Sequence, residues 1–381
     1  MARIETPRAV AFLFDSQPAS WTSREDQHLA VSRALLCRGI QPIIFLSRAT
    51  DGLRSTYESA GVVVIDANYR DGARQYFLRM REVFRQYRVD TVDIEFFCYF
   101  DPIAWMARAL GVRRIVFTES NSGLLRSKSW KLRLLRLRAV FWTLPVRRFV
   151  AISDFVGRQM AALGMSDSRI AVIHKGLDLG RYGADRGARA RLEEAYGVAP
   201  DEIVLGTITM LRAFKHPEVI LHACALLQAR QVPFRLFIAG EGELKPELMA
   251  LAERLGIGRR VIWLGYVERP EDVLRGWDAF LLASEGEAFG FVLLEAMASG
   301  LPVVAARSGA IPEVVADGVT GLLTPVLDAT AMAAAIEKLA RDECLRLRLG
   351  SAGAARVRDF FSIGGAVEKT LRVYDSLPAD L

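Results

Sequence analysis

Short runs of β-branched and aromatic residues alternate with helical stretches along the whole chain, and this alternation limits the fold more than any other feature. Strands that alternate with helices form parallel βαβ units. In the first half the predicted strands are 9–14, 42–46, 62–65, 92–94, 114–117, 149–152 and 170–173. After a polar, glycine-bearing stretch at 183–200, the predicted strands are 203–208, 234–239, 261–264, 279–282 and 302–305. The sequence therefore predicts an α/β fold with two doubly wound parallel sheets.

The length of 381 residues is too great for one ordinary core and suits two domains of roughly 150 to 200 residues each. We predict a Rossmann-like domain at 1–182 and a second one at 183–360. The segment 361–381 has the apolar positions of a closing helix, and we expect it to cross back to the first domain. Ligands of doubly wound sheets bind beyond the carboxyl ends of the strands. Two such sheets are therefore expected to face a cleft lined by strand-to-helix loops.

Composition excludes several classes of protein. Hydrophobic residues make up 51% of the chain and charged residues 25%, as in globular rather than disordered proteins. No apolar run approaches the ~18 residues of a membrane span, and the first twenty residues, which include Glu5 and Asp15, lack the layout of a signal peptide. We therefore predict a cytoplasmic protein. Neither the four cysteines nor the four histidines have the spacing of metal ligands, so no metal site is expected.

Positive charge is concentrated between residues 126 and 148, where eight Lys and Arg residues occur without an acid. Leucines and aromatic residues interleave with these basic residues, as in a helix that lies on an anionic membrane surface. A solvated helix that packs partly on the core and joins two strands would need the same apolar positions, so both interpretations stay open. Nucleic-acid binding is disfavoured because no aromatic-rich recognition module accompanies the charge.

Two carboxylates, Glu287 and Glu295, lie on either side of a glycine that opens a predicted helix. The helix is indicated by apolar residues on one face, by Gly300 after its end and by a following proline. A helix that begins at Gly290 directs unpaired N–H groups at whatever lies in front of it, which favours an anion such as a diphosphate. Glu295 would then lie under one end of that ligand and Glu287 beside the other, as needed to hold a nucleotide sugar. The alternative is a buried helix with one capping acid and one exposed acid.

Two cations follow the strand that ends at Ile208, namely Arg212 and Lys215. At this spacing both can face one cleft. An Arg fork and a Lys ammonium would neutralise a diphosphate leaving group in a site without metal ligands. A helix-entry charge pair that faces water is the alternative.

Three further loops give weaker signals. Gly240, in the loop 239–243, could permit close approach of a ligand, although a simple turn is the favoured interpretation. Val267 follows a strand where the base of a nucleotide could rest. Gly309, in the loop 308–313, could admit the donor sugar, and an ordinary helix entry would have the same residues.

The order of these motifs resembles that of glycosyltransferase family 4, and the Glu287-x7-Glu295 element is its most specific part. The resemblance covers roughly 149–350, more than half the chain. Its segments are 151–153, 173–178, 212–215, 239–242, 264–267, 287–295, 309–313 and 318–321.

The resemblance implies a two-domain GT-B fold and retaining transfer of a sugar from a UDP-, GDP- or ADP-sugar, with no metal or other cofactor. By resemblance, Glu287 contacts the hydroxyls of the donor sugar and Glu295 those of the ribose. Arg212 and Lys215 contact the diphosphate. Gly290 and Phe291 offer backbone N–H groups to a phosphate.

Three positions depart from the family pattern. Met210 stands where many members have an arginine, and Arg212 resembles a subgroup that places its cation two positions later. Lys175 replaces a usual asparagine. Ser120 replaces a histidine that would bind the transferred sugar, so Glu119 or Asn121 is expected to take over on the acceptor side.

The predicted function is transfer of a hexose-type sugar to a saccharide or lipid-linked acceptor in cell-envelope or exopolysaccharide biosynthesis, with an anionic membrane as a possible partner through 126–148. Two alternatives stay open. One is a nucleotide-sugar epimerase of the same fold, and the other is a non-catalytic descendant that binds saccharide or nucleotide. A nicotinamide dehydrogenase is disfavoured because no G-x-G-x-x-G follows the first strand.

Overall fold

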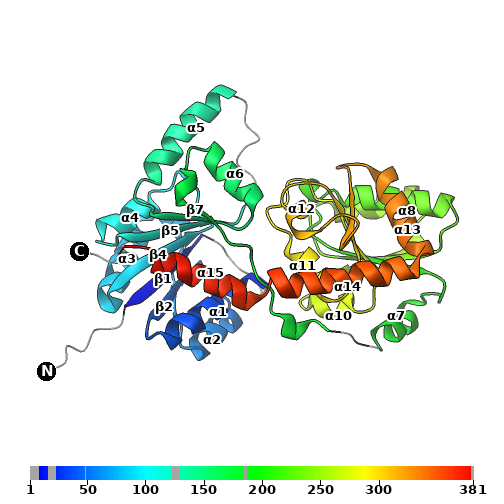
Figure 1. Cartoon of the computed structure of the whole chain (residues 1–381), viewed down its shortest axis with the longest axis horizontal. Helices are drawn as coiled ribbons and strands as arrows, with labels where there is room; N and C mark the ends of the chain where they lie inside the picture. The colour runs from blue at the N-terminus through cyan, green and yellow to red at the C-terminus, as the bar shows by residue number, and fades with distance from the viewer. Residues whose placement is uncertain are drawn as a thin grey trace. The chain divides into compact units, whose positions relative to one another are not determined.

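The computed structural model describes residues 8–15, 23–47, 49–121, 129–183, 185 and 187–378, excluding the side chains of 23–24 and 129–135 (Figure 1). Much of the amino-terminal stretch used to predict the location lies outside these ranges, as do Arg126 and Lys128 of the basic run. The chain divides into two compact units. Unit 1 contains Met1–Gly176 and Ile363–Leu381, and unit 2 contains Leu177–Ser362.

Unit 1 is built on a seven-stranded sheet with the order β3-β2-β1-β4-β5-β6-β7, in which every neighbouring pair is parallel. Its strands are β1 (Ala9–Phe14), β2 (Gln41–Leu46), β3 (Val63–Asp66), β4 (Val89–Glu95), β5 (Arg114–Glu119), β6 (Arg148–Ala151) and β7 (Ile170–Val172). Its helices are α1 (Ser23–Cys37), α2 (Asp51–Ser59), α3 (Ala73–Tyr87), α4 (Ile103–Ala109), α5 (Ser129–Trp142), α6 (Asp154–Ala162) and α15 (Ile363–Asp375).

Strand β1 lies inside this sheet, between β2 and β4, and all six of its residues are buried. A strand buried on both faces is a continuous apolar run, which made it easy to recognise from sequence. The strand order reverses between β1 and β4, and in such sheets ligands bind beyond the carboxyl ends of the strands at this point. Asp15 and Glu95 occupy that position in unit 1.

The closing helix predicted in 361–381 corresponds to α15, and a separate helix, α14 (Glu343–Phe360), precedes it. The chain breaks at Phe361, whose carbonyl accepts a hydrogen bond of 2.8 Å from the N–H of Leu177. In unit 1, α15 packs against α1. The hydroxyl of Tyr374 donates to Asp93 of β4 at 2.6 Å, so α15 is attached to unit 1 by polar as well as apolar contacts.

Unit 2 contains a six-stranded sheet with the order β10-β9-β8-β11-β12-β13, again parallel throughout. Its strands are β8 (Ile203–Ile208), β9 (Phe234–Ala239), β10 (Val261–Gly265), β11 (Ala279–Leu282), β12 (Val303–Ala306) and β13 (Gly321–Thr324). Its helices are α7 (Ala188–Tyr196), α8 (Pro217–Ala229), α9 (Lys245–Arg254), α10 (Pro270–Leu274), α11 (Phe291–Ala298), α12 (Ile311–Val314), α13 (Ala329–Arg341) and α14. The two doubly wound parallel sheets confirm the predicted fold class.

The structure differs from the sequence-based prediction at two points in unit 2. Strand β13 is absent from the predicted strands because it is short and begins at a glycine that belongs to a motif. The boundary between the units falls after Gly176 rather than after Tyr182. Residues 177–182 are held by unit 2, since Arg181 pairs with the buried Glu271 at 3.1 Å and its carbonyl accepts from Arg275.

Candidate active site

The loops that follow β8 and β11 bring together two of the sequence-predicted residues. These strands are neighbours in the sheet, so their carboxyl-end loops lie side by side. The ammonium of Lys215 is 2.6 Å from Oε2 of Glu287, and the two side chains are 14% and 15% exposed. A Lys–Glu pair that solvent still reaches can exchange partners when an anion arrives, because neither group is sealed in the core.

Arg212 and Phe214 complete the cationic side of this site. The Lys215 ammonium lies 5.3 Å from the centroid of the Phe214 ring, a cation–π distance. Arg212 precedes the short 3₁₀ helix Ala213–Lys215 and is exposed. Its guanidinium makes no hydrogen bond or ion pair to any residue that the structure describes. The site therefore holds one cation that is already paired and a second whose donors face solvent.

The start of α11 requires a glycine at position 290. Gly290 caps this helix in the left-handed conformation, with φ of 92°, and an added Cβ would lie 3.0 Å from Cδ1 of Leu293. No side chain caps the helix, so its first N–H groups, including that of Phe291, are directed away from the helix and can meet an anion. Glu295 lies one turn further along α11 and is buried. The predicted helix start and the placement of both acids are thus confirmed as geometry, whereas their roles remain predictions.

The loop after β12 fixes the backbone of Glu287. The N–H of Ala310 donates to the Glu287 carbonyl at 2.8 Å, and the N–H of Gly286 donates to Oγ of Ser308 at 2.8 Å. Gly309 lies directly against the backbone of Glu287. Three neighbouring loops at one edge of the sheet are therefore hydrogen-bonded into a single surface around Glu287.

One of the weaker donor-side predictions, Gly240, has a structural explanation. Gly240 has φ of 134°, and an added Cβ would lie 1.9 Å from the carbonyl oxygen of Thr209. Close packing of two loops thus accounts for this glycine. Val267 is half-buried and follows β10. Donor binding by Gly240 and Val267 remains a prediction.

Sequence reasoning missed His216, which follows Lys215 directly. Its Nδ1 is 2.9 Å from Glu218 and its Nε2 is 3.3 Å from Glu285. A histidine before the proline that starts α8 suggests a helix entry, but no sequence signal pairs it with an acid 69 residues away.

Glu119, which is predicted to lie on the acceptor side, is the last residue of β5 and is 5% exposed. Burial raises the pKa of this carboxyl to about 7, although hydrogen bonds from Tyr99 and from the backbone N–H of Asn121 partly oppose the rise. The Asn121 N–H lies 2.7 Å from Glu119 Oε1. The structure thus brings Glu119 and Asn121 together, and a carboxyl that holds its proton near neutral pH can donate a hydrogen bond to a ligand.

Two of the departures from the family pattern meet at Glu95, the last residue of β4. The Lys175 ammonium lies 3.2 Å from Glu95 Oε1, and the Ser120 hydroxyl donates to the same oxygen. His28 Nε2 is 3.1 Å from Oε2. Burial alone would raise the pKa of Glu95, but Lys175 and His28 outweigh burial and lower it below the ordinary value. Lys175 and Ser120 therefore belong to one buried network in unit 1.

The described end of α5 and the turn that follows it expose apolar side chains. Leu137, Phe141 and Leu144 are 71%, 53% and 53% exposed, whereas Ala139 is buried. The indole N–H of Trp105 on α4 donates to the Phe141 carbonyl at 3.0 Å. In Figure 1, α5 projects from the sheet of unit 1. Part of the basic run thus packs on unit 1 while the rest presents apolar residues to solvent.

No helix among the described residues is both long enough and apolar enough to cross a bilayer.

Two family models match the chain, one in each half. The model of glycosyl transferases group 1 matches residues 189–356, and the model of Glycosyltransferase Family 4 matches residues 29–181.

Characterised relatives match over part of their length. The D-inositol 3-phosphate glycosyltransferase of Actinosynnema mirum is 34% identical over 228 residues, which are 56% of this chain and 54% of that protein. The N-acetyl-alpha-D-glucosaminyl L-malate synthase of Bacillus anthracis is 34% identical over 191 residues, which are 50% of this chain and 49% of that protein. The chain thus spans about half the length of these curated relatives.

Solved structures match over nearly the whole chain. Anabaena HepE, crystallised with UDP and glucose, has a TM-score of 0.81 at 20% identity and covers 97% of this chain and 99% of its own. A glycosyltransferase from Rickettsia africae has a TM-score of 0.82 at 18% identity, with coverages of 97% and 98%. At these identities the likeness shows a shared fold.

Proposed function

Because the chain belongs to glycosyltransferase family 4, we propose that it moves a hexose-type sugar from a nucleotide diphosphate sugar to a hydroxyl of a saccharide or lipid-linked acceptor, with retention of configuration. Its fold is GT-B. The observation that carries the proposal is the Lys215–Glu287 pair at 2.6 Å beside the uncapped start of α11. This arrangement offers positive charge, directed N–H groups and a carboxylate within one set of loops.

In the proposed mechanism the donor diphosphate lies at the amino-terminal end of α11, with Arg212 and Lys215 beside it. Lys215 exchanges its carboxylate partner for a phosphate oxygen, which frees Glu287 to accept hydrogen bonds from the donor sugar. Glu295 faces the ribose hydroxyls. The two cations stabilise the charge that develops on the leaving group, so the proposal requires no metal ion.

The acceptor hydroxyl attacks the anomeric carbon from the face that the nucleoside diphosphate leaves. The bond from that carbon to the phosphate oxygen breaks, the bond to the acceptor oxygen forms, and the departing phosphate oxygen takes the hydroxyl proton. Configuration is therefore retained. No side chain has to act as a strong base, because the protein contributes positioning and charge stabilisation. We assign Glu119 and Asn121 in unit 1 to the acceptor side.

A screen of nucleotide sugars tests this function. UDP-, GDP- and ADP-sugars are added singly, and thermal protection and release of nucleoside diphosphate are measured with and without saccharide acceptors. We expect protection by one donor class and acceptor-dependent release. UDP-glucose is the first donor to try, since a protein of the same fold was crystallised with it. Conversion of the donor sugar without an acceptor would indicate an epimerase, and protection without turnover a binding protein.

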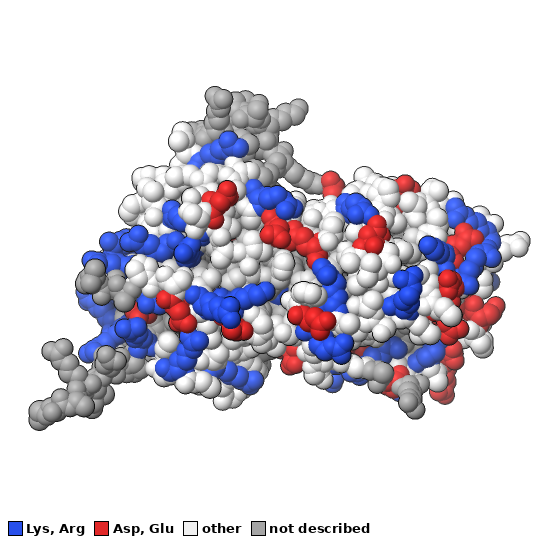
Figure 2. Space-filling model, in the orientation of Figure 1, with Lys and Arg blue, Asp and Glu red and all other residues white. Residues whose placement is uncertain are grey.

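We also propose that unit 1 docks on an anionic membrane through the exposed end of α5. Apolar side chains at Leu137, Phe141 and Leu144 can enter the interface, and Arg136, Arg138 and Arg147 add positive charge. On the face of unit 1 that Figure 2 shows, basic side chains cover more surface than acidic ones. An acceptor carried by a lipid on the cytoplasmic face of the membrane would then lie close to the enzyme.

Vesicle flotation tests the membrane proposal. The chain should float with phosphatidylglycerol vesicles at low salt, because basic residues near the surface each contribute about 1 kcal/mol, and should float poorly with phosphatidylcholine. Replacing Leu137 and Phe141 by serine should abolish flotation. Leu347→Ser on α14 removes a comparably exposed leucine, 66% exposed, from unit 2 and serves as the control. Flotation that survives the double replacement would refute this surface.

A further inference from the structure

We propose that His216 and Glu285 form a positioning pair that holds the Lys215 and Glu287 loops together, an inference that rests on the proposed function. The two pairs are successive along both loops. Lys215 reaches Glu287 at 2.6 Å, and its neighbour His216 reaches Glu285 at 3.3 Å. The first pair is the one that donor binding would open. The second pair lies beside it and would stay closed.

The backbone of His216 supports a positional role. His216 has φ of 48°, which places a non-glycine residue in the left-handed region. Such a conformation is uncommon and persists where surrounding contacts determine it. The following residue is Pro217, the first residue of α8, and the imidazole lies between Glu218 of that helix and Glu285 of the other loop. The left-handed residue therefore redirects the chain into α8 with its ring directed at both carboxylates.

The main chain of the two loops is joined at the same place. The N–H of Glu285 donates to the carbonyl of Phe214 at 3.0 Å, two residues before His216. The His216–Glu285 contact thus closes a small cross-link formed by one backbone and one side-chain interaction. On its other side the Glu285 loop is attached to Ser308 through Gly286. Only the Lys215 and Glu287 side chains in this cross-linked surface have to change partners.

The consequence concerns the rate rather than the affinity. If the loops are held by His216 and Glu285, Lys215 can leave Glu287 for a phosphate without any separation of the two loops. Without the cross-link, Lys215 and Glu287 would be placed less precisely, and a misplacement of about 1 Å can cost up to 10²-fold in rate. The N–H groups at the start of α11 and the Arg212 guanidinium would be unaffected, so KM for the donor should change less than kcat.

The test compares two variants on the cross-link with one beside it. His216→Asn keeps a residue that tolerates the left-handed backbone but is too short to reach Glu285, and Glu285→Gln removes the charge of the partner. Glu218→Gln removes the other partner of the same imidazole and is the matched control. We expect each of the first two variants to lower kcat about 10-fold with less than 2-fold change in KM for the donor. The double variant should be no worse than either single variant, and the control should stay within 2-fold of wild type.

Hydrogen exchange separates this inference from the function on which it rests. The amide of Glu285 should exchange faster in His216→Asn than in Glu218→Gln, whether or not a donor has been found. Faster exchange in a protein that turns over no donor would support the cross-link and count against the proposed transferase. Unchanged exchange at Glu285, or wild-type kcat in both cross-link variants of an active enzyme, would overturn the inference.

Discussion

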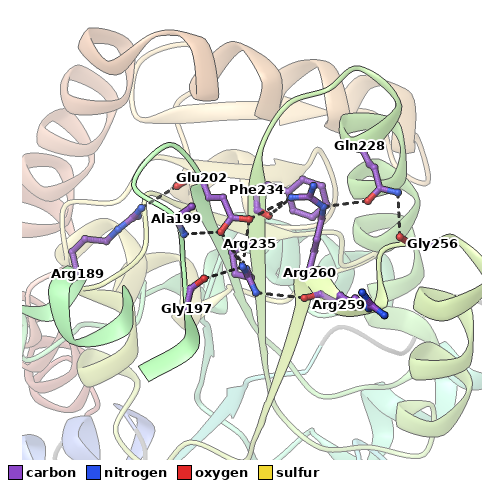
Figure 3. Close-up of polar contacts among 10 residues, drawn as sticks. All are labelled: Arg189, Gly197, Ala199, Glu202, Gln228, Phe234, Arg235, Gly256, Arg259 and Arg260. Carbon is purple, nitrogen blue, oxygen red and sulfur yellow. Dashed lines mark hydrogen bonds and ion pairs between the residues drawn. The ribbon is translucent and has the colours of Figure 1, made fainter. Parts of the chain in front are cut away.

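The two edges of the sheet in unit 2 use charged residues in opposite ways. At the amino-terminal edge, Glu202 lies just before β8 and is buried among arginines. It pairs with Arg235 at 3.1 Å and with Arg260 at 3.3 Å, and it also accepts from the backbone N–H of Ala199 (Figure 3). These contacts join the starts of three neighbouring strands. The acceptor capacity of the carboxylate is used within the protein, as is typical of a charge that stabilises the fold.

A second acid at the same edge is also paired within the protein. Asp278, before β11, accepts from Arg189 at 2.6 Å and from the N–H of Val204 at 2.7 Å. Arg189 also donates to the carbonyl of Glu202 at 2.9 Å (Figure 3). Each guanidinium group binds several oxygens at once, so few of its N–H donors are left for a ligand.

At the carboxyl edge, the cations keep N–H donors that are not paired with the described residues. Lys215 has a single carboxylate partner, and the Arg212 side chain has none among the residues described. This edge therefore keeps cationic donors that an anion can engage. Ion pairs alone therefore do not identify a site. The difference lies in how completely each charged group is already hydrogen-bonded.

Lys215→Ala tests the carboxyl edge, here called the open edge because its cations can still bind an anion, and this variant has the largest expected effect. Turnover with the best donor should fall about 10²- to 10³-fold, the usual cost of losing one transition-state donor. Removing the ammonium also leaves Glu287, which is 15% exposed, without its partner, so unit 2 should lose some stability and kcat is compared at a temperature at which both proteins are folded. The measurement is steady-state kcat together with hydrogen exchange of unit 2 peptides. Lys338→Ala on α13 removes an exposed lysine and is the control. A Lys215→Ala enzyme with full activity would show that the open edge is not the catalytic one.

Glu202→Gln tests the amino-terminal edge of the sheet, where the charged groups are already paired. The variant leaves two arginines without their carboxylate, and breaking a largely buried pair costs about 3 kcal/mol. Hydrogen exchange in β8 and β9 should report that loss, while kcat at a permissive temperature stays at the wild-type value. Glu337→Gln also separates a carboxylate from two arginines, Arg230 and Arg341, but at the surface, where a pair contributes at most about 1 kcal/mol. Equal losses in the two variants would contradict the assignment of the Glu202 edge to stability.

Much of the fold could be predicted because a buried parallel strand is a continuous apolar run. Strands β8 and β9 have the bounds expected from sequence, whereas β13 was missed because four residues that begin with glycine carry little signal. Helix α11 was predicted from its apolar face and from the glycine and proline that follow its end. Such local patterns do not specify the order of strands in a sheet.

The site was predictable to the extent that the carboxyl-edge rule applies. This rule placed Arg212, Lys215 and Glu287 at one edge before β8 and β11 were known to be neighbours. The His216–Glu285 contact and the convergence of Lys175 and Ser120 on Glu95 could not be predicted. Each depends on tertiary distances between segments that are far apart in the chain.

Unit 1 shows the same contrast, at the ends of two adjacent strands, between a charged group that is paired within the protein and one that is not. Glu95 on β4 is surrounded by Lys175, His28 and Ser120, and its pKa is lowered. Glu119 on β5 faces Tyr99 and backbone N–H groups, with no ion pair to any residue that the structure describes, and burial raises its pKa to about 7. The two carboxyls should therefore give opposite pH dependences. The lowered pKa of Glu95 contributes stability that is present above its ordinary pKa and is lost as the pH falls towards the folded value.

The smallest predicted effect concerns Glu119 and has the opposite sign. Because Glu119 keeps its proton to about pH 7 when folded, the native state binds more protons than the unfolded state from roughly pH 4.5 to pH 7, and stability falls as pH rises through that window. Glu119→Gln removes the titration but keeps an acceptor for Tyr99. Relative to wild type, the variant should gain about 2 kcal/mol between pH 5 and pH 7, measured by hydrogen exchange of unit 1. Glu95→Gln should instead be less stable throughout this range, because Lys175 is left buried without its partner. A Glu119→Gln profile parallel to wild type would mean that Glu119 is ionised in the folded protein, so that it could only accept hydrogen bonds from an acceptor and not donate one.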